Sequence, residues 1–560
     1  MTHTSEVVHP QPRTTHTVFN QSVPRVDVNE YETDTVLVEA VNRHDGAWGD
    51  TELREIGALV GSEAFKHDAK VANTQLPQLH TFDNYGHRID EVEYSDVYHR
   101  IIGASISHGA HTRCWADPQP GSHVVRATAF MLFGQIEPGH ACPVSMTHAV
   151  IPSLELQPDV AAQWVPKALS RSYSPELSAS KESAIFGMSM TEKQGGSDVR
   201  ANTTVARPAG VGGPGAPYLL TGHKWFCSAP MSDAFLVLAQ AEGTGGEGLS
   251  CFLLPRVLDD GTRNVFRIQR LKDKLGNKSN ASSEIELDGT VAFMIGEPGR
   301  GVRTIIEMVA QTRLDCVLGS AAGMRQSVAE AVWHARHRDA FGAKLVSQPA
   351  MTAVLADLAL ESEAATTTAI RLARAHDEDA DDTERAFRRL ATAVAKYWIC
   401  KRGPHHAYES LECLGGNGYT EDFPMAMRYR EQPVMAVWEG SGNVIALDVL
   451  RAMTREPESI GAFDAEVNKV RGTDPILDAH LDSVRSQLGE LAGLDPASAQ
   501  RRARRVVESM ALALQASLLV QYAPATVSEA FVAARLGADR SLEYGALPDG
   551  VDLQAILERH

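Results

Sequence analysis

The sequence predicts an α+β fold with a helical N-terminal domain, a central antiparallel β-barrel or sheet, a C-terminal four-helix bundle and an extra helical tail domain. Between residues 185 and 296, six short segments rich in Val, Ile, Leu, Phe and Thr follow one another, each bounded by Gly, Pro, Asp or Asn. On either side, apolar residues recur at helical spacing. The expected divisions are an arm over 1–35, a helical domain over 36–184, a β domain over 185–296, a bundle over 297–455 and a helical domain over 456–560.

Composition indicates an ordinary globular protein. Of the 560 residues, 43% are hydrophobic and 22% are charged. The net charge of −18 does not favour non-specific attraction to nucleic acid or to an anionic membrane. The seven cysteines are scattered without a CxxC pair, which predicts reduced thiols and a cytoplasmic location. We see no signal-peptide pattern and no apolar run long enough for a membrane span.

The helical half of the chain begins near residue 302. Long amphipathic stretches cover 302–341, 350–376 and 384–403 with short links, which predicts antiparallel helices of a bundle. A further helix is expected after residue 443, and helical spacing continues beyond 456.

Two stretches match the G-x-G-x-x-G pattern of dinucleotide-binding loops, GVGGPG at 210–215 and GTGGEG at 243–248. Such a loop needs a strand before it and a helix after it. Both matches lie between expected strands, so we interpret them as hairpin turns. The adjacent histidines of HHAYE (405–409) are wrongly spaced for ligands one helical turn apart, and we expect no metal.

Two stretches near the start of the β domain leave alternatives open. MSMTEKQGGSDVRANTT (188–204) could bring small residues close to a flat polar heterocycle, or could be a Gly-rich loop capped by Ser197 and Asp198. In GHKWFCS (222–228), one of Trp225 and Phe226 is expected to face the core. The other could stack on a planar cofactor or also belong to the core.

Two loops of the helical half also allow two interpretations each. RHRDAFGAKLVSQPAM (336–351) is either a solvated link or a site where Arg338, Phe341 and Gln348 bind a pyrophosphate and an adenine. LECLGGNGYTED (411–422) ends a helix with a glycine pair, which is either a C-cap or a place where phosphate packs on bare backbone.

A single acid, Glu439, stands between Trp438 and Gly440 in VWEGSGN (437–443). One interpretation is an acid in the first turn of a helix on a solvated loop. The other is a catalytic carboxylate beside a bulky ring that excludes water, with small residues that leave room for a substrate.

In this order, the motifs T-E-x-x-G-G-S-D, G-x-K-W-F-x-S, R-x-x-F-G…Q, L-G-G-N-G-Y and W-E-G-S-G-N resemble those of the acyl-CoA dehydrogenase family of flavoproteins. The resemblance covers roughly residues 100–455. The segment THTVFNQ, the wording MTEKQGGSDV and the helical tail narrow it to the alkylation-response (AidB-type) branch, whose members carry a tail proposed to bind DNA. It implies FAD as cofactor, an acyl-CoA thioester as substrate, an electron acceptor that the sequence does not identify, and a homo-oligomer, with a tetramer expected.

The resemblance also implies individual roles. Glu439 matches the catalytic base, and Arg313 matches an arginine near the active centre that would meet substrate. Ser197 would lie near the phosphates or the thioester ligand, whereas Arg338 and Gln348 would reach the FAD of a neighbouring subunit. The residues implied to contact FAD are Met190, Thr191, Ser197, Phe226, Ser228, Arg338, Phe341, Gln348, Gly415, Gly416, Trp438, Gly440, Ser441 and Asn443.

The chemistry implied for Glu439 is α,β-dehydrogenation, in which the base removes an α-proton and the β-hydride passes to flavin N5. The α-C–H bond of a thioester is weakly acidic. A carboxylate in a dry pocket has a raised pKa and is therefore a stronger base. Donors aimed at the thioester carbonyl, in the family the backbone amide of the base and a flavin hydroxyl, contribute roughly 3–4 kcal/mol each.

The tail supports a second hypothesis, a DNA-associated alkylation-response flavoprotein with weak or vestigial dehydrogenase activity. Residues 456–560 contain ten Lys and Arg and sixteen Asp and Glu, so the net charge of the tail is −6. The basic cluster is RRARR, with Arg501, Arg502, Arg504 and Arg505. Contact with duplex DNA needs several such charges on one face. The alternative is a solvated helix in a domain that packs against the rest of an oligomer.

Overall fold

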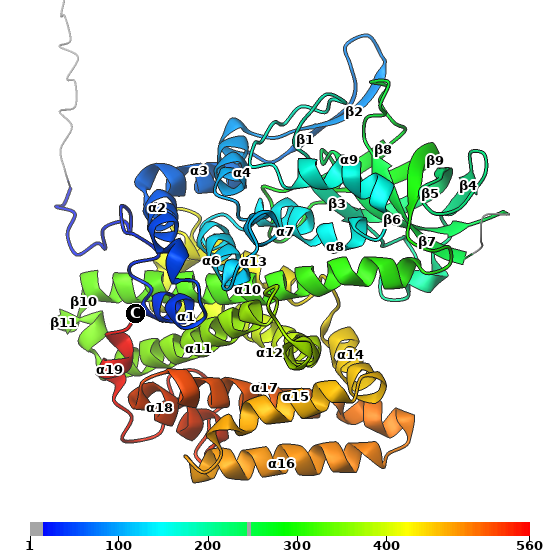
Figure 1. Cartoon of the computed structure of the whole chain (residues 1–560). Coiled ribbons are helices and arrows are strands. Elements are labelled where there is room, and N and C mark those ends of the chain that lie inside the picture. Colours follow the sequence, from blue (N-terminus) through cyan, green and yellow to red (C-terminus); the bar gives the residue numbers. More distant parts are fainter. Residues whose placement is uncertain (1–14, 244–247) are drawn as a thin grey trace, which may run out of the picture.

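The computed structural model describes residues 15–243 and 248–560. Within them, helices flank a β region at one end and continue into a long bundle with an attached tail (Figure 1). Residues 1–14 of the expected arm lie outside the described residues, and 15–34 contain no helix or strand. No described helix combines the length and the apolar character that are needed to cross a membrane.

The N-terminal part is helical, as expected, but it also contains a hairpin that the sequence did not predict. Its nine helices within the described residues are α1 (Thr35–Arg43), α2 (Asp50–Gly61), α3 (Glu63–Thr74), α4 (Asp96–Ser107), α5 (Arg113–Ala116), α6 (Ser122–Gly134), α7 (Ala141–Ala149), α8 (Ile151–Leu154) and α9 (Pro158–Ala168). The hairpin is formed by β1 (Gln78–Phe82) and β2 (Arg88–Glu93), which are antiparallel. Ser62 and Ser95 cap α3 and α4 by accepting bonds from Phe65 N and Tyr98 N.

The β region is a seven-stranded sheet. Its strands are β3 (Phe186–Ser189), β4 (Val205–Pro208), β5 (Pro217–Ser228), β6 (Ala234–Ala241), β7 (Gly248–Pro255), β8 (Arg267–Leu271) and β9 (Ser282–Ile295). The six predicted segments all contain strands, and β3 is an addition. The pairings run from β6 through β4, β5, β9 and β7 back to β6.

The expectation of a purely antiparallel sheet is wrong in one respect, because β3 and β4 both pair with β6 in parallel. A connecting loop between β3 and β4 lets each of them align with a different half of the longer β6. GVGGPG joins the antiparallel strands β4 and β5, which confirms the hairpin interpretation. GTGGEG lies largely outside the described residues, between the antiparallel strands β6 and β7.

The bundle contains the three long helices that the sequence predicted. They are α10 (Gly301–His337), α11 (Pro349–Arg374) and α12 (Asp382–Cys413), followed by α13 (Met425–Met435) and α14 (Gly442–Arg455). Asp381 caps α12 by accepting a bond from Glu384 N, and Pro349 begins α11, where a missing N–H carries no cost. Helices α10 and α12 pack along each other, and α13 packs on both.

The tail adds α15 (Glu458–Val467), α16 (Pro475–Ala492), α17 (Pro496–Tyr522), α18 (Ala525–Leu536) and α19 (Leu553–Leu557). Helix α17 packs against α11, α12 and α14 of the bundle, so the tail lies along the bundle (Figure 1). A buried ion pair joins Arg371 of α11 to Glu466 of α15 at 2.9 Å. Removing one partner of a buried ion pair strongly destabilises a fold, so this pair holds the tail on the bundle.

Candidate active site

Glu439 lies in the turn between α13 and α14, where φ is 57° at Glu439 and 112° at Gly440. Two cations hold three successive carbonyl oxygens of this turn. Lys396 Nζ donates to Trp438 O at 2.9 Å and to Gly440 O at 2.6 Å. Arg313 Nε donates to Glu439 O at 3.1 Å. The turn therefore keeps its left-handed backbone through side chains from outside the turn.

The two cations come from the long helices of the bundle. Lys396 of α12 is 1% exposed, and a buried ammonium is tolerated because it is hydrogen-bonded. Arg313 of α10 is held in turn by Asp448 of α14, with 2.8 Å between Arg313 Nη1 and Asp448 Oδ2. Lys396 was not among the residues predicted from the sequence. The signal was available, since it is a lone lysine in the otherwise apolar stretch LATAVAKYWIC.

The carboxyl group of Glu439 has the properties of a base in a dry site. The residue as a whole is partly exposed, but its Oε2 is buried and has no hydrogen-bond partner among the described residues. Burial raises the pKa of Glu439, and the charge of Arg313, the Thr312 hydroxyl and the charge of Lys396 oppose that rise. Because burial dominates, the carboxylate is a stronger base than an exposed glutamate.

The end of β5 and helix α7 meet this turn at Cys142. Burial raises the pKa of the Cys142 thiol to about 11; the charge of Glu439 adds to the rise, and the Ser228 hydroxyl lowers it through a hydrogen bond. Ser228 Oγ lies 3.0 Å from Ser282 Oγ. Met190 packs against the hydrophobic cluster that contains Cys142, as does Trp438. The structure thus brings Ser228, Trp438 and Glu439 together around Cys142, and Met190 packs on the same hydrophobic cluster.

The loop that contains Thr191 and Ser197 is anchored by its buried glutamate. Glu192 accepts a bond from Lys224 Nζ at 3.0 Å and from Thr204 Oγ1 at 2.6 Å. Thr191 O accepts from Trp225 N at 2.9 Å, which ties the loop to β5. Ser197 is exposed. The capping alternative is not supported at Asp198, whose side chain makes no cap bond to the following turn.

The expectation that Trp225 or Phe226 faces the core is wrong. Trp225 is partly buried, and Phe226 is 50% exposed. A register shift between Lys224 and Cys227 leaves those two side chains as the buried ones, so both rings are turned away from the core. Lys272 Nζ lies 3.3 Å from the Trp225 ring centroid and 4.7 Å from that of Phe226.

Arg338, Phe341 and Gln348 share one hairpin at the far end of α10. The hairpin contains β10 (Asp339–Ala340) and β11 (Ala343–Lys344), and Phe341 at its tip is fully exposed. Gln348 Nε2 donates to Ala340 O at 2.9 Å. With a rise of 1.5 Å per residue, Arg338 lies about 37 Å along α10 from Arg313. Within one chain these residues do not join the Glu439 site.

The remaining residues predicted to bind the cofactor are exposed or have free space around them. Gly415 and Gly416 lie in a 3-10 turn after α12, and a Cβ added to either would meet nothing within 4 Å. Ser441 and Asn443 are exposed at the N-terminus of α14, and the Ser441 side chain makes no cap bond. These positions leave backbone and side-chain donors accessible to a ligand.

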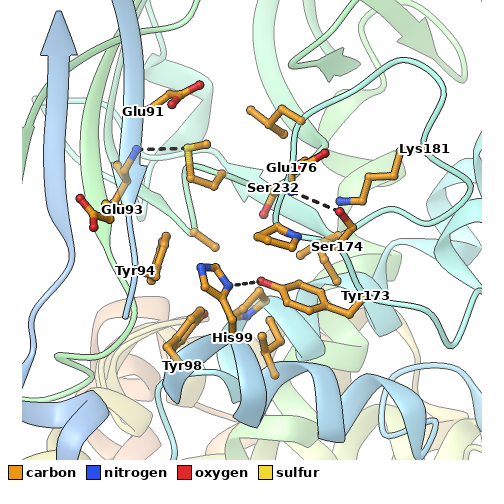
Figure 2. A pocket seen from close by; sticks show the side chains of 18 of the residues that line it. Glu91, Glu93, Tyr94, Tyr98, His99, Tyr173, Ser174, Glu176, Lys181 and Ser232 are labelled. Atoms are coloured by element: carbon orange, nitrogen blue, oxygen red, sulfur yellow. Dashed lines mark hydrogen bonds between the residues drawn. The ribbon is translucent and has the colours of Figure 1, made fainter. Parts of the chain in front are cut away.

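A cavity of about 590 Å³ lies between the β1–β2 hairpin, α4 and the segment 173–181. Figure 2 shows His99 and Tyr173 joined by a hydrogen bond of 2.8 Å at its floor. None of the site residues predicted from the sequence lines it. Two lining residues, Pro143 and Ala229, directly follow Cys142 and Ser228, so the cavity approaches the Glu439 site without containing it.

The four arginines of RRARR are exposed on α17. Three of them have partners: Arg501 Nη2 donates to Ser498 Oγ at 2.7 Å, Arg502 pairs with Glu490 at 2.9 Å, and Arg504 Nε donates to Tyr397 Oη at 3.2 Å. Arg504 also approaches the Glu439 turn, since a Cβ added at Gly442 would lie 3.6 Å from Arg504 Nη2.

Comparison with known proteins places these features in one family. Residues 20–175 match the AidB N-terminal domain of adaptive response proteins, 187–290 the acyl-CoA dehydrogenase middle domain and 299–454 the acyl-CoA dehydrogenase C-terminal domain. AidB of Escherichia coli (strain K12) is 42% identical over 85% of this chain and 87% of its own length. Caenorhabditis elegans ACDH-11, solved in complex with C11-CoA, has a TM-score of 0.85 at 27% identity and covers 96% of each chain.

A Bacillus anthracis acyl-CoA dehydrogenase complexed with FAD has the same fold, with a TM-score of 0.59 at 17% identity over 78% of this chain and 76% of its own. The prediction of an acyl-CoA-dehydrogenase-like α+β fold is therefore confirmed. The ordered domain matches and the similarity to AidB over most of both chains lead to one conclusion: this protein belongs to the acyl-CoA dehydrogenase family, in its AidB-type branch.

Proposed function

We propose that the protein is a FAD-containing enzyme that catalyses α,β-dehydrogenation of an acyl-CoA thioester, with Glu439 as the base. The observation that carries the proposal is the buried, unpartnered Oε2 of Glu439, in a turn whose carbonyls are held by Lys396 and Arg313. A buried carboxylate oxygen without a hydrogen-bond partner lowers the stability of the fold, so its presence indicates a functional role.

The residues around this turn fit a flavin. The Trp438 indole Nε1 is buried without a partner among the described residues, so a ligand acceptor would satisfy it. The half-exposed ring of Phe226 is available for stacking, and Ser228 presents a hydroxyl. We propose that Met190, Thr191, Phe226, Ser228 and Trp438 hold the cofactor. When bound, FAD supplies the hydride acceptor that no side chain provides.

Residues of the chain supply the remaining steps. The backbone N–H of Glu439 makes no hydrogen bond within the described residues, so it is free to donate to a thioester carbonyl. Arg313 and Lys396 occupy the carbonyl oxygens of the turn and keep this N–H in place. The Glu439 carboxylate then takes the α-proton. Trp438 excludes water, which maintains the raised pKa of the base.

An acyl-CoA substrate is supported by the C. elegans relative, whose structure contains C11-CoA. We further propose a homo-oligomer in which Arg338, Phe341, Gln348, Gly415 and Gly416 contact the cofactor of a neighbouring subunit, since Arg338 lies about 37 Å along α10 from Arg313 of the Glu439 site.

The test is an anaerobic titration of the purified protein with a panel of acyl-CoAs, in which reduction of the flavin is measured as loss of its visible absorbance. The same titration is carried out with the Glu439→Gln variant. Bleaching by one class of acyl-CoA that disappears in Glu439→Gln is expected. Protein that is folded and pure but contains no flavin would overturn the proposal. If FAD is bound but no acyl-CoA bleaches it, the cofactor assignment would stand and the proposed dehydrogenase activity would be rejected.

A second candidate function is favoured by the exposed arginines of α17. We propose as this alternative that the AidB-type protein associates with duplex DNA and that its dehydrogenase activity is weak or vestigial. Arg501 and Arg505 make no salt bridge among the described residues and could contact phosphate. The acidic balance of the tail argues against tight binding, so the test compares binding at low and at moderate salt.

A further inference from the structure

A buried cluster of one cysteine and two histidines lies in the N-terminal helical part and includes no residue of the Glu439 turn. Cys114 belongs to α5, His123 to α6 and His148 to α7. All three are at most 2% exposed. The Cys114 sulfur and one ring nitrogen from each histidine lie within 4.8 Å of one another, a spacing that a metal ion could close to normal bond lengths with a small movement.

Two ring nitrogens in this cluster are buried without a partner. Neither His123 Nε2 nor His148 Nε2 makes a hydrogen bond to any described residue. Buried polar groups are normally paired, so these two nitrogens remain available to a ligand that accepts electron pairs.

The surroundings of His148 are compatible with the protonation state that a metal ligand needs. His148 Nδ1 lies 3.1 Å from His111 O, and the Trp115 indole N–H can donate to His148 Nδ1 at 2.9 Å or to His148 O at 3.0 Å. In the arrangement in which Trp115 donates to His148 O and Nδ1–H donates to His111 O, the lone pair is on Nε2, the unpartnered atom. Metal-binding histidines are commonly oriented in this way by a carbonyl on the other nitrogen.

The charges around the cluster are compatible with a cation. Nearby Arg126 is neutralised by its bidentate contact with Asp315. Asp377 accepts the backbone N–H of His123 at 2.7 Å and places a carboxylate beside the cluster.

We propose that Cys114, His123 and His148 form a structural binding site for a zinc-class divalent ion. One thiolate and two imidazoles are the ligand set that such an ion prefers over magnesium or calcium. Gln311 lies against His148, and its buried Oε1 is unpartnered, which provides a candidate fourth ligand. Binding releases the Cys114 thiol proton and joins the four-residue helix α5 to α6 and α7.

This site was not expected from the sequence, which offered only the adjacent histidines of HHAYE as metal candidates. In the structure His406 Nε2 is bonded to Leu358 O at 3.0 Å and His405 pairs with Glu543 at 3.0 Å, so these two histidines are occupied otherwise. The ligands of the new cluster come from three helices and have no short sequence spacing, which is why no motif showed them.

The experiment measures metal in the purified full-length protein and in two alanine variants. Cells are grown with added zinc, the protein is dialysed, and metal content is determined by elemental analysis; cobalt is then exchanged into the protein and its absorption recorded. Cys114→Ala removes the proposed thiolate. Cys251→Ala removes an equally buried thiol in β7 and serves as the matched control.

We expect about one zinc ion per chain in the unmodified protein and in Cys251→Ala, with a thiolate-to-cobalt charge-transfer band in both. Cys114→Ala should lose the band and most of the metal. His148→Gln, a second variant that keeps the thiol, should lose the metal as well. The proposal is overturned if folded unmodified protein binds no zinc or cobalt, or if Cys114→Ala retains metal and band as Cys251→Ala does.

Discussion

Lys396 Nζ lies 2.6 Å from the carbonyl oxygen of Gly440, and the same ammonium reaches Trp438 O at 2.9 Å. Glu439 is the residue between these two carbonyls. One buried charge on α12 therefore fixes the backbone on both sides of the proposed base and contributes positive potential to its carboxylate. Lys396 acts as a positioning residue, because it touches the turn and not the substrate.

Replacing Lys396 with Met should loosen this turn and shift the pH dependence of the reaction. Two carbonyls lose a charged donor, at a cost of about 2–3 kcal/mol of stability. Because Lys396 lowers the pKa of Glu439, its removal should move the acidic limb of kcat/KM to higher pH. Thermal unfolding and a pH–rate profile measure both effects.

The matched control is Lys401→Met on the same helix, since the Lys401 ammonium makes none of the hydrogen bonds found in the described residues. It should leave the acidic limb in place. An acidic limb at the same pH in Lys396→Met and in the unmodified protein would contradict the role given to Lys396.

Glu439→Gln should be inactive but more stable at neutral pH. Loss of the base should reduce kcat by about 10²–10⁴-fold. Burial raises the pKa of Glu439 in the folded protein above its unfolded value, so the ionised carboxylate destabilises the fold. This cost is absent below about pH 4, the ordinary pKa range of glutamate, and grows as pH rises through the folded pKa.

Melting temperatures of Glu439→Gln and unmodified protein should therefore agree at acid pH and diverge at neutral pH, with the variant higher. Glu529→Gln, which changes an exposed acid on α18, is the control and should show no such divergence. A lower melting temperature for Glu439→Gln at neutral pH would mean that the ionised carboxylate is stabilising, contrary to its burial.

Much of the architecture could be predicted because periodicity is a local property. The long helices α10, α11 and α12 and six strands of the sheet followed from apolar spacing and turn residues. The β1–β2 hairpin was missed because its strands are short and largely exposed, so they lack an apolar pattern. The parallel pairing of β3 with β6 depends on chain topology, which local pattern does not specify.

The site was predictable in part for a different reason. Glu439 and Ser228 were identified because motifs mark them, whereas Lys396, Cys142 and Asp448 belong to no motif and become visible only through contacts across the fold. The orientation of the Trp225 and Phe226 rings was wrong because a single register shift in β5 reverses which residues are buried. Irregularities of this kind leave no periodic signal.

We expect Asn20 to stabilise the hairpin that contains Arg338 against local opening. Asn20 Nδ2 donates to Asp339 O at 2.8 Å, and Asp339 N donates to Asn20 Oδ1 at 2.7 Å. Arg338 also donates to Asn20 O at 2.6 Å. Asn20→Ala removes the two side-chain bonds, and at about 1 kcal/mol each this should speed amide hydrogen exchange at Asp339 roughly tenfold or more.

Gln21→Ala is the neighbouring control, because no hydrogen bond of the Gln21 side chain occurs in the described part of the chain. Exchange at Asp339 should be unchanged there. Equal exchange rates in Asn20→Ala and Gln21→Ala would show that the hairpin is ordered without the N-terminal segment.

Replacing the exposed arginines of α17 tests whether the tail contacts duplex DNA. Arg501, Arg502 and Arg505 are exposed, whereas Arg504 is bonded to Tyr397 and lies near the Glu439 turn, so it is left unchanged. If the alternative function holds, replacing the three with Ala should weaken duplex binding at low salt. It should also reduce the slope of log K against log salt by up to about 3, since each phosphate contact contributes about 0.9.

A second triple variant, with Arg471, Arg485 and Arg540 replaced by Ala, removes the same charge elsewhere on the tail. Its binding and its salt slope should remain close to those of the unmodified protein. Equal effects of the two triple variants would assign any binding to net charge alone. No measurable binding of the unmodified protein at low salt would reject DNA as a partner and leave the tail as a packing domain on α11, α12 and α14.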